Sequence, residues 1–457
     1  MNPETDLENK NILILGYAKS GQAAANFFLA KGAQVTLSDN QVLDRDQTLE
    51  SLLERGLVLV DGQQPVSLLE AGFDFIVKNP GIPYSIPILQ AAKAQSIPIY
   101  TDIEIASWFS QAPMIAITGS NGKTTTTALI NEILGEKAIL AGNIGIPILS
   151  VVGETQADKR LVMEISSFQL QGTSFFKPKI GVITNIYPTH LDYHGSMEAY
   201  IAAKLKIAAN LDEQDFLVYN YDQEILQEAA KSIKAIKLPF SRTQVTPELV
   251  AEGLYLQDGQ VIYHNQPILS LDSIKIPGDH NIENVLAALA VAVIEKVDLP
   301  QVKATIEAYK GMPHRIEHVA SFKGREFYND SKATNMTATI TALASFNQDL
   351  IYIGGGLDRG NEFDDLIPHL SHIKQAFLYG ETKEKMAKAF EKVDIPFVLA
   401  DNLREASHLA YQATQAGQVL LFSPACASWD QFKSFEIRGD QFKDLIAHSI
   451  QDEPYIL

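Results

Sequence analysis

The sequence predicts an α/β protein of three domains, each built around a mainly parallel sheet. Short apolar runs alternate with longer helix-like segments along most of the chain, which is the pattern of β-α-β units. At 457 residues and 46% hydrophobic content, the chain is long enough to bury several separate cores. The pattern restarts near residues 106–113 and after residues 311–313, so we expect domains at residues 1–110, 111–312 and 313–457.

The first domain is predicted to be Rossmann-like. A buried strand at residues 11–15 is followed by a turn between Gly16 and Gly21, then a helix and a strand ending at Asp39. The glycines are spaced G-x-x-x-x-G, and Ala18 stands where the middle glycine of a dinucleotide site would let a pyrophosphate approach the backbone. A nicotinamide-dependent dehydrogenase is therefore disfavoured.

Two features of this domain could contact a sugar nucleotide. Asp39 lies where a carboxylate would meet a ribose or a base edge, although capping of the next turn explains it about equally well. A strand at residues 73–77 runs into Lys78-Asn-Pro-Gly-Ile-Pro83, a rigid turn that exposes backbone donors. Such a turn could hold a sugar or a phosphate.

The central domain opens with a predicted phosphate-binding loop. A strand at residues 114–118 leads into Gly119 and Gly122, and Lys123 and Thr124 then begin a helix. Backbone N–H groups, the helix N-terminus and the lysine would hold phosphate oxygens, and the threonine hydroxyl would face Mg²⁺. The general pattern G-x-x-x-x-G-K-[ST] requires a glycine where this chain has Ile117. An ordinary glycine-rich turn is the alternative, but the order of strand, glycines, Lys-Thr and helix favours nucleotide binding.

Two further strands are expected to end beside this loop. The strand at residues 161–165 carries Glu164, and the strand at 180–185 leads to His190. If they are parallel to residues 114–118, their carboxyl ends form one crevice, where open α/β sheets bind ligands. A carboxylate in an apolar strand needs a metal or another cation nearby, or else a structural ion pair. A lone histidine is more often a structural residue.

The rest of the central domain adds two candidate pairs. Lys204 and Lys206 lie in one predicted helix, residues 202–207, and cannot face the same way, so one of them is expected to point inward. Asn281 and Asn284 lie on the first turn of an apolar helix, where each suits either capping or hydrogen bonding to a planar base. Capping is expected for one of the two, not for both.

The last domain is again predicted to be a doubly wound, Rossmann-like α/β unit. Its strands, expected near residues 350–353, 376–378, 397–399 and 419–422, alternate with helix-like segments. Arg315, Lys332 and Arg359 stand in polar loops of this domain. Charged residues of this kind are usually solvated, but their position in such loops favours ligand binding.

Composition excludes several functional classes. The net charge of −18, from 55 acidic and 37 basic residues, argues against a nucleic-acid-binding protein. The acidic N-terminus and the short longest apolar run, residues 285–294, predict a cytoplasmic protein that does not insert into a membrane. The single cysteine, Cys426, excludes an intrachain disulfide, and its small neighbours indicate a packed thiol.

Taken together, these motifs resemble the Mur ligase family of ATP-dependent amide-forming enzymes over nearly the full chain. The resemblance is carried by Thr118-Gly-Ser-Asn-Gly-Lys-Thr124, Gly142-Asn-Ile-Gly145, Glu164-Ile-Ser-Ser-Phe-Gln-Leu170, His190-Leu-Asp, Asp279-His-Asn281, His314-Arg315 and Asp330-Ser-Lys-Ala-Thr-Asn335. The last of these stretches, together with residues 423–433, is similar to the branch that adds D-glutamate. Other branches and folylpolyglutamate synthases share the phosphate loop and differ at these two places.

This resemblance implies a reaction in peptidoglycan precursor synthesis. The γ-phosphate of ATP is transferred to the carboxylate of UDP-N-acetylmuramoyl-L-alanine, and the amine of D-glutamate attacks the acyl phosphate, giving ADP and phosphate. Mg²⁺, most often two ions, and a carbamylated Lys204 are also implied. The enzyme is expected to be a cytoplasmic monomer that acts on small-molecule substrates. A different Mur-type or folylpolyglutamate-type ligase, and a non-catalytic ATP-binding regulatory protein, remain alternatives.

The resemblance also implies a set of site residues. The implied catalytic residues are Lys123, Glu164, His190, Lys204 and Lys332, and the implied metal site is Thr124, Glu164, His190 and Lys204. For ATP it implies Gly119, Ser120, Asn121, Gly122, Lys123, Thr124, Thr125, Asn281, Asn284, Arg315 and Asp330. For the UDP-sugar it implies Asp39, Asn40, Asn79, Gly81, Asn143 and His190, and for D-glutamate Lys332, Thr334, Arg359, Ser428, Trp429 and Phe435.

Two residues depart from the family pattern. Arg359 stands where the family often has a lysine, and arginine can form two parallel hydrogen bonds with a carboxylate where lysine cannot. Trp429 stands where a smaller aliphatic residue is common, so it could reshape the amino-acid pocket or shield it.

Overall fold

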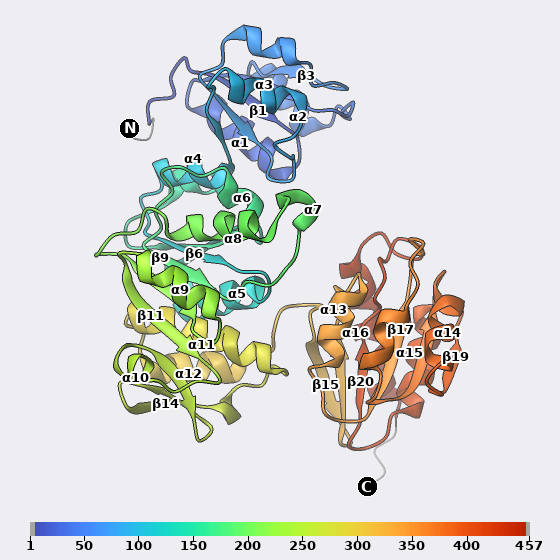
Figure 1. The fold of residues 1–457 in the computed structure, drawn as a ribbon. Helices are drawn as coiled ribbons and strands as arrows, with labels where there is room; N and C mark the ends of the chain where they lie inside the picture. The colour runs from blue at the N-terminus through green and yellow to red at the C-terminus, as the bar shows by residue number, and fades with distance from the viewer. Residues whose placement is uncertain (1–4, 454–457) are drawn as a thin grey trace. The chain divides into compact units, whose positions relative to one another are not determined.

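The structure is a computed structural model that describes residues 5–453 and contains three α/β domains, each with its own sheet (Figure 1). The predicted fold class is confirmed. The chain divides into two compact units: one takes the chain up to Leu271 together with Glu283–Ile306, and the other takes Asp272–Ile282 together with the chain from Glu307 onward. No helix within residues 5–453 is long and apolar enough to cross a membrane.

The N-terminal sheet has five parallel strands in the order β3-β2-β1-β4-β5. Alternate residues of its central strand pack into two separate cores, Ile12 and Ile14 into one and Leu13 and Leu15 into the other, so both faces of the sheet are covered. The elements are β1 Asn11–Leu15, α1 Lys19–Ala30, β2 Gln34–Ser38, α2 Gln47–Glu54, β3 Val58–Val60, a 3-10 helix Val66–Ala71, β4 Phe75–Lys78, α3 Pro87–Ala94, β5 Ile99–Tyr100 and α4 Asp102–Phe109.

The central sheet has nine strands in the order β14-β13-β12-β11-β10-β9-β6-β8-β7. The strands from β7 to β12 in this order are parallel, and β13 and β14 add an antiparallel edge. The strands are β6 Met114–Thr118, β7 Ala138–Gly142, β8 Arg160–Glu164, β9 Ile180–Ile183, β10 Phe216–Asn220, β11 Ile236–Ser241, β12 Leu254–Gln257, β13 Gln260–Tyr263 and β14 Gln266–Ser270. The α-helices are α5 Lys123–Leu134, α6 Ser167–Gln171, α7 Leu191–His194, α8 Met197–Leu205, α9 Glu224–Ser232, α10 Pro247–Glu252, α11 Asp279–Ile294 and α12 Leu299–Ala308.

The C-terminal sheet has six strands in the order β15-β16-β20-β17-β18-β19, and only β15 is antiparallel to its neighbour. On β20, Val419 and Leu421 pack into one core and Leu420 and Phe422 into another, so this strand is covered on both faces. The elements are β15 Glu317–Phe322, β16 Arg325–Asn329, α13 Met336–Leu343, β17 Leu350–Gly355, β18 Ile373–Tyr379, α14 Lys383–Glu391, β19 Phe397–Leu399, α15 Leu403–Ala413, β20 Val419–Phe422 and α16 Phe435–Asp452.

The helix expected at residues 202–207 differs from the prediction at both ends. It begins at Met197, where the side chain of Ser196 accepts a hydrogen bond from the Ala199 N–H and caps the first turn. It ends at Leu205, and Lys206–Ala208 continues as a 3-10 turn. The expectation of one continuous helix was therefore wrong.

The strand expected at residues 180–185 is shorter than predicted and ends at Ile183. Its next two residues turn their side chains to the phosphate loop: Thr184 Oγ1 donates to the carbonyl oxygen of Asn121, and Asn185 Oδ1 accepts from the Asn121 N–H. These bonds tie the end of β9 to the loop in place of further strand pairing.

Candidate active site at the phosphate loop

The predicted phosphate loop follows β6 and ends where α5 begins at Lys123. Gly119 and Gly122 have φ values of +154° and +80°, and a Cβ at either position would overlap a neighbour, Thr184 Oγ1 for the first and Asn284 Oδ1 for the second. Both glycines are therefore required by the backbone and by its neighbours. The missing glycine is explained by Ile117, which is still inside the strand, fully buried and paired with β8 and β9.

Two lysines converge on this loop. Lys123 Nζ donates to the carbonyl oxygens of Gly119, at 2.7 Å, and Ser120, at 2.9 Å. Lys204 Nζ, on α8, donates to the same Gly119 oxygen at 2.7 Å, and the residue is only 1% exposed. Lys206 is only half-buried and donates to the carbonyl oxygens of Gln171 and Thr173. The expectation that one lysine of the pair points inward is confirmed, and that lysine is Lys204.

The environment of Lys204 favours its neutral form. Burial, and then the nearby charge of Lys123, lowers the pKa of Lys204 to about 6. Lys204 Nζ lies 4.8 Å from the centre of the Tyr200 ring, a contact that favours the ammonium, but burial and Lys123 outweigh it. An uncharged buried amine is a nucleophile at neutral pH, which an ordinary lysine is not.

Glu164, at the end of β8, is 2% exposed and has one carboxylate oxygen bound and one unbound. Oε1 accepts a hydrogen bond of 2.6 Å from Asn143 Nδ2, whereas Oε2 is buried and has no hydrogen-bond partner among the described residues. No ion pair of Glu164 is found in residues 5–453, so a structural ion pair does not explain it there. A buried, unpaired carboxylate oxygen fits the charge and the oxygen preference of Mg²⁺.

The other expected metal-site residues lie on neighbouring elements. Thr124 is buried on the first turn of α5, and His190 is exposed, has a φ of +54° and precedes α7. Within residues 5–453, no group of three or more His, Cys, Asp or Glu side chains is placed to hold a metal ion. The expected set contains only two residues of these types, so the fit depends on the free oxygen of Glu164.

A cavity of about 600 Å³ extends from this loop to the carboxyl ends of the N-terminal strands. Of the residues expected to contact a UDP-sugar, Asn79, Gly81, Asn143 and His190 line it, and Asp39 and Asn40 do not. The Asp39 carboxylate accepts hydrogen bonds from the backbone N–H groups of Tyr17 and Gln41. The sequence left open whether Asp39 caps the next turn or contacts a ligand, and these bonds show that it caps the turn.

Sequence reasoning missed one buried residue beside this cavity. Lys78 is 1% exposed, and its Nζ donates to the carbonyl oxygens of Pro80 and Ile82 and to the hydroxyl of Tyr193. Burial lowers the pKa of Lys78 to about 7. It thus braces the turn that carries Asn79 and joins it to α7, which follows His190. A lysine at the end of an apolar strand was the available signal.

The two asparagines of α11 have different partners. Asn281 Nδ2 donates to the carbonyl oxygen of Pro277, at 2.6 Å, and Asn284 Oδ1 accepts from Thr126 Oγ1, at 3.3 Å. Asn281 therefore satisfies a backbone group just before the helix, whereas Asn284 contacts the helix that follows the phosphate loop. Neither bond goes to an N–H group at the start of the helix, so the expectation that one of the two asparagines caps the helix stays a prediction.

In the second unit, the residues expected beside ATP and the amino acid lie on adjoining loops. Asp330 is 3% exposed, accepts hydrogen bonds from Ser423 Oγ and the Ile316 N–H, and has a pKa that burial raises to about 7. The Lys332 N–H donates to the carbonyl oxygen of His314, at 2.9 Å, so the loop of Lys332 is joined to the turn that carries Arg315.

The expected amino-acid contacts form two groups. Lys332 Nζ lies 5.5 Å from the ring centre of Phe435, and Thr334 is half-buried on the same loop as Lys332. Arg359 stacks its guanidinium 5.0 Å from the ring of Trp429, which is 64% exposed and follows the buried Ser428. The two departures from the family pattern are therefore in contact with each other.

Cys426 is buried, and burial raises the pKa of its thiol to about 11. A thiol with so high a pKa is a weak nucleophile. The prediction of a packed thiol is confirmed.

Most of the chain is similar to known protein families and to known relatives. Family profiles match residues 10–101 (Mur ligase MurD-like, N-terminal domain), 117–292 (Mur ligase middle domain) and 314–426 (Mur ligase, glutamate ligase domain). The UDP-N-acetylmuramoylalanine--D-glutamate ligases of Streptococcus pyogenes serotype M1 and serotype M49 (strain NZ131) are each 47% identical over 442 residues, covering 96% of this chain and 97% of the relative.

Solved structures share the fold at lower identity. UDP-N-acetylmuramate-alanine ligase from Thermotoga maritima has a TM-score of 0.58 at 17% identity, covering 96% of this chain and 99% of that one. The MurF ligase of the same organism, solved with ADP, has a TM-score of 0.54 at 16% identity, covering 98% and 96%. With profiles along all three domains and relatives matched over nearly their whole length, the chain belongs to the Mur ligase family.

Proposed function

We propose that this protein is an ATP-dependent ligase that joins D-glutamate to UDP-N-acetylmuramoyl-L-alanine. The observation that supports this chemistry is the arrangement at the carboxyl ends of β6 and β8. The phosphate loop, the unpaired oxygen of Glu164 and the buried amine of Lys204 come together there. The choice of D-glutamate rests on the relatives, which are named for that reaction and match 96% of this chain at 47% identity.

In the proposed reaction, a carboxylate oxygen of the muramoyl-alanine attacks the γ-phosphorus of ATP and the bond to ADP breaks. The neutral amine of D-glutamate then attacks the acyl carbon, the C–O bond breaks, phosphate leaves, and one proton is lost as the amide forms. Both steps bring negative groups together, so the site must supply positive charge. Lys123 and the N–H groups of residues 122–125, where α5 begins, are the groups of this chain that we assign to the phosphates.

We assign a Mg²⁺ site to Glu164 and Thr124, and a second site near His190 and Lys204. The unpaired, buried Oε2 atom of Glu164 supports the first assignment. Bound there, Mg²⁺ would neutralise charge that develops on the transferring phosphoryl group. Glu164 would hold the ion, and Asn143 would orient the carboxylate through its bond to Oε1.

We further propose that Lys204 is carbamylated. Carbamylation requires a neutral amine to attack CO₂, and the pKa of about 6 for Lys204 supports this requirement. The product carries oxygen atoms and a negative charge, which suit Mg²⁺ better than an ammonium does. Its position beside the phosphate loop, at the Gly119 oxygen, supports a metal-site role for the carbamate.

For the sugar nucleotide we propose the cavity of about 600 Å³ lined by Asn79, Gly81, Asn143 and His190. Asp39 and Asn40 are retained only as candidates for the far end of the nucleotide. For the base of ATP we propose Asn281 and Asn284, and for its phosphate and ribose we propose Arg315 and Asp330.

For D-glutamate we propose contacts from the second unit. The amine-bearing end would meet Lys332 and Thr334, and the distal carboxylate would meet Arg359, with Ser428, Trp429 and Phe435 shaping the pocket. The stacking of Arg359 on Trp429 supports this arrangement because it holds a planar donor pair in one orientation. The amide product of this reaction is a peptidoglycan precursor, and ATP is converted to ADP and phosphate as it forms. We also propose that the protein is a cytoplasmic monomer that serves cell-wall synthesis, cell shape and division.

The test is phosphate release by purified protein with ATP, Mg²⁺, UDP-N-acetylmuramoyl-L-alanine and D-glutamate, with each component omitted in turn. We expect release only in the complete mixture, and a product heavier by one glutamyl residue in mass spectrometry. Lys123→Met should abolish turnover, whereas Lys137→Met, an exposed lysine beyond the other end of α5, should not.

Other outcomes of this assay separate the alternatives. Turnover with another amino acid of a panel that includes L-glutamate, L-lysine and meso-diaminopimelate would favour a sister ligase. Tight ATP binding with no turnover for any amino acid would favour a regulatory ATP-binding protein and would refute the proposal.

A further inference from the structure

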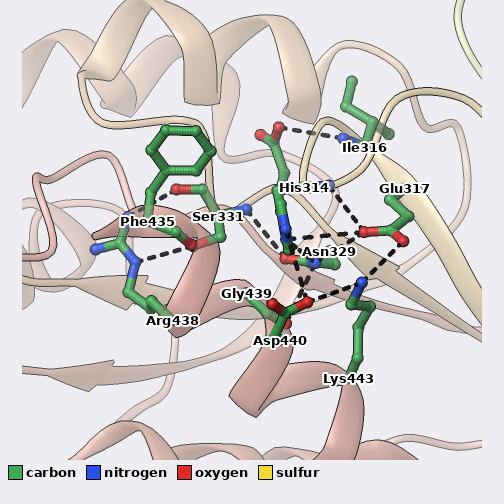
Figure 2. A network of polar contacts seen from close by, with 11 residues as sticks. His314, Ile316, Glu317, Asn329, Ser331, Phe435, Arg438, Gly439, Asp440 and Lys443 are labelled. Atoms are coloured by element: carbon green, nitrogen blue, oxygen red, sulfur yellow. Dashed lines mark hydrogen bonds and ion pairs between the residues drawn. The ribbon is translucent and has the colours of Figure 1, made fainter. Parts of the chain in front are cut away.

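Arg438, on the second turn of α16, is a buried cation that the proposed contacts leave unexplained. It is fully buried, at 0% exposed, and its two hydrogen bonds go to one neutral residue. Nε donates to Ser331 Oγ at 3.0 Å, and Nη2 donates to the Ser331 carbonyl oxygen at 2.7 Å (Figure 2). Its charge interacts with the carboxyl groups of Asp330 and Asp430, but no ion pair of Arg438 within 4 Å is found in residues 5–453. Burying a charge without such a pair destabilises a fold, so a hydrophobic side chain would serve packing alone better.

Three loops that carry proposed amino-acid contacts meet at this guanidinium. Through Ser331 it holds residues 330–335, which include Lys332. Its Nη1 atom lies 3.2 Å from where a Cβ on Gly356 would stand, in the glycine loop that leads to Arg359. Its guanidinium carbon lies 5.8 Å from the ring centre of Phe422, the last residue of β20 before the 423–430 loop.

Further hydrogen bonds of Ser331 link the start of α16 to the turn that carries Arg315. Ser331 Oγ donates to the Phe435 carbonyl oxygen, and the Ser331 N–H donates to Asn329 Oδ1. Figure 2 shows the network running on from Asn329 to His314 and Glu317. Arg438 and His314 therefore hold the Lys332 loop from two sides.

Backbone strain makes the His314 side of this network sensitive to its neighbours. His314 and Ile316 have φ values of +62° and +43°, which residues with side chains adopt at a cost. A Cβ on Gly439 would overlap the imidazole of His314, so α16 approaches this turn as closely as glycine allows. The turn keeps its shape because the buried network fixes it.

We propose that Arg438 is a positioning residue for the incoming amino acid, which it does not touch: it holds the 330–335 loop, and with it Lys332, where the amino acid binds. This inference rests on the proposed function. If Arg438 has a purely structural role, its loss should lower the thermal stability of the protein and impair the kinetic constants for all three substrates together. A positioning role predicts that the Michaelis constant for the amino acid changes and that the Michaelis constant for the sugar nucleotide does not.

The test compares Arg438→Met and Arg438→Lys with the parent. The methionine variant loses both bonds to Ser331, and we expect its KM for D-glutamate to rise about 10-fold or more. Its KM for the sugar nucleotide should stay within about 2-fold, because the residues that we assign to the sugar nucleotide lie on other loops. The lysine variant keeps the charge and can form only one of the two hydrogen bonds to Ser331. Its KM for D-glutamate should therefore lie between the values of the parent and the methionine variant.

Arg325→Met is the matched control. Arg325 is also buried in this domain, at 7% exposed, but it bonds Tyr411 and Glu453 and none of the three loops. It should lower the thermal midpoint and leave the KM for D-glutamate unchanged. Equal shifts of that KM in the Arg438 and Arg325 variants, or an unchanged KM in both Arg438 variants, would overturn the inference.

The parent protein separates this inference from the proposed function. Absence of D-glutamate-dependent turnover in the parent counts against the proposed function alone. The KM comparison is then made with whichever amino acid of the panel supports turnover, and the same pattern is expected for it.

Discussion

Replacing Lys204 by alanine tests the centre of the proposed site. The magnitude follows from the pKa of about 6: at pH 7.5 such an amine is neutral in about 97% of molecules, against about 0.1% for an ordinary lysine. The buried amine is thus about 1000-fold richer in the form that attacks CO₂. We expect Lys204→Ala to lower turnover at least about 100-fold, since a metal-site anion is lost.

The assay is phosphate release with and without short carboxylates such as formate or acetate, which should restore part of the activity by replacing the carbamate. Lys206→Ala is the control, because Lys206 donates to Gln171 and Thr173 and not to the phosphate loop. In the parent, ¹³C-labelled bicarbonate should give a carbamate carbon signal, and turnover should fall as pH drops through about 6, where the Lys204 amine becomes protonated. Activity of Lys204→Ala within a few-fold of the parent, or no carbamate signal, would refute the reasoning.

Three further predictions concern other parts of the site. Glu164→Gln keeps the volume and removes the charge, so turnover should fall about 100-fold and the Mg²⁺ requirement should rise; an unchanged Mg²⁺ titration contradicts the metal assignment. A double-mutant cycle of Arg359→Lys and Trp429→Leu, read as KM for D-glutamate, should give a coupling of about 0.5–1 kcal/mol; additive effects would mean that the stack does not act in solution. Burial raises the pKa of Asp330 above its value in the unfolded chain, so the parent should lose stability as the pH rises from about 4 to about 7, whereas Asp330→Asn should not. Thermal unfolding should therefore show a difference in midpoint between variant and parent that shifts in favour of the variant from pH 5 to pH 8.

Local patterns were sufficient where the physics is local. The apolar strand before Gly119 and the Lys-Thr pair after it predicted the phosphate loop, because turn, helix start and strand are all set by residues within a few positions. The strand ends were predicted less well. β9 stops at Ile183 because the side chains of Thr184 and Asn185 bond the loop, a contact with residues more than sixty positions away.

The glycine missing from the general loop pattern shows the same division. From the sequence, Ile117 was a departure from a motif. In the structure it is a fully buried strand residue paired with β8 and β9, so the loop is shorter and starts after Thr118. The spacing of a motif depends on where its strand ends, and sheet pairing decides that.

By itself, the sequence determined the α/β class, the phosphate loop and the family, because these depend on periodicity, turn chemistry and motif order along the chain. Only the tertiary structure decided which lysine points inward, which oxygen of Glu164 is left unpaired, and that Arg438 holds Ser331. Lys204 meets Gly119 across 85 positions, and Arg438 meets Ser331 across 107. Burial and desolvation set the protonation and the pairing of these groups, and both are properties of the packed fold rather than of neighbouring residues in the chain.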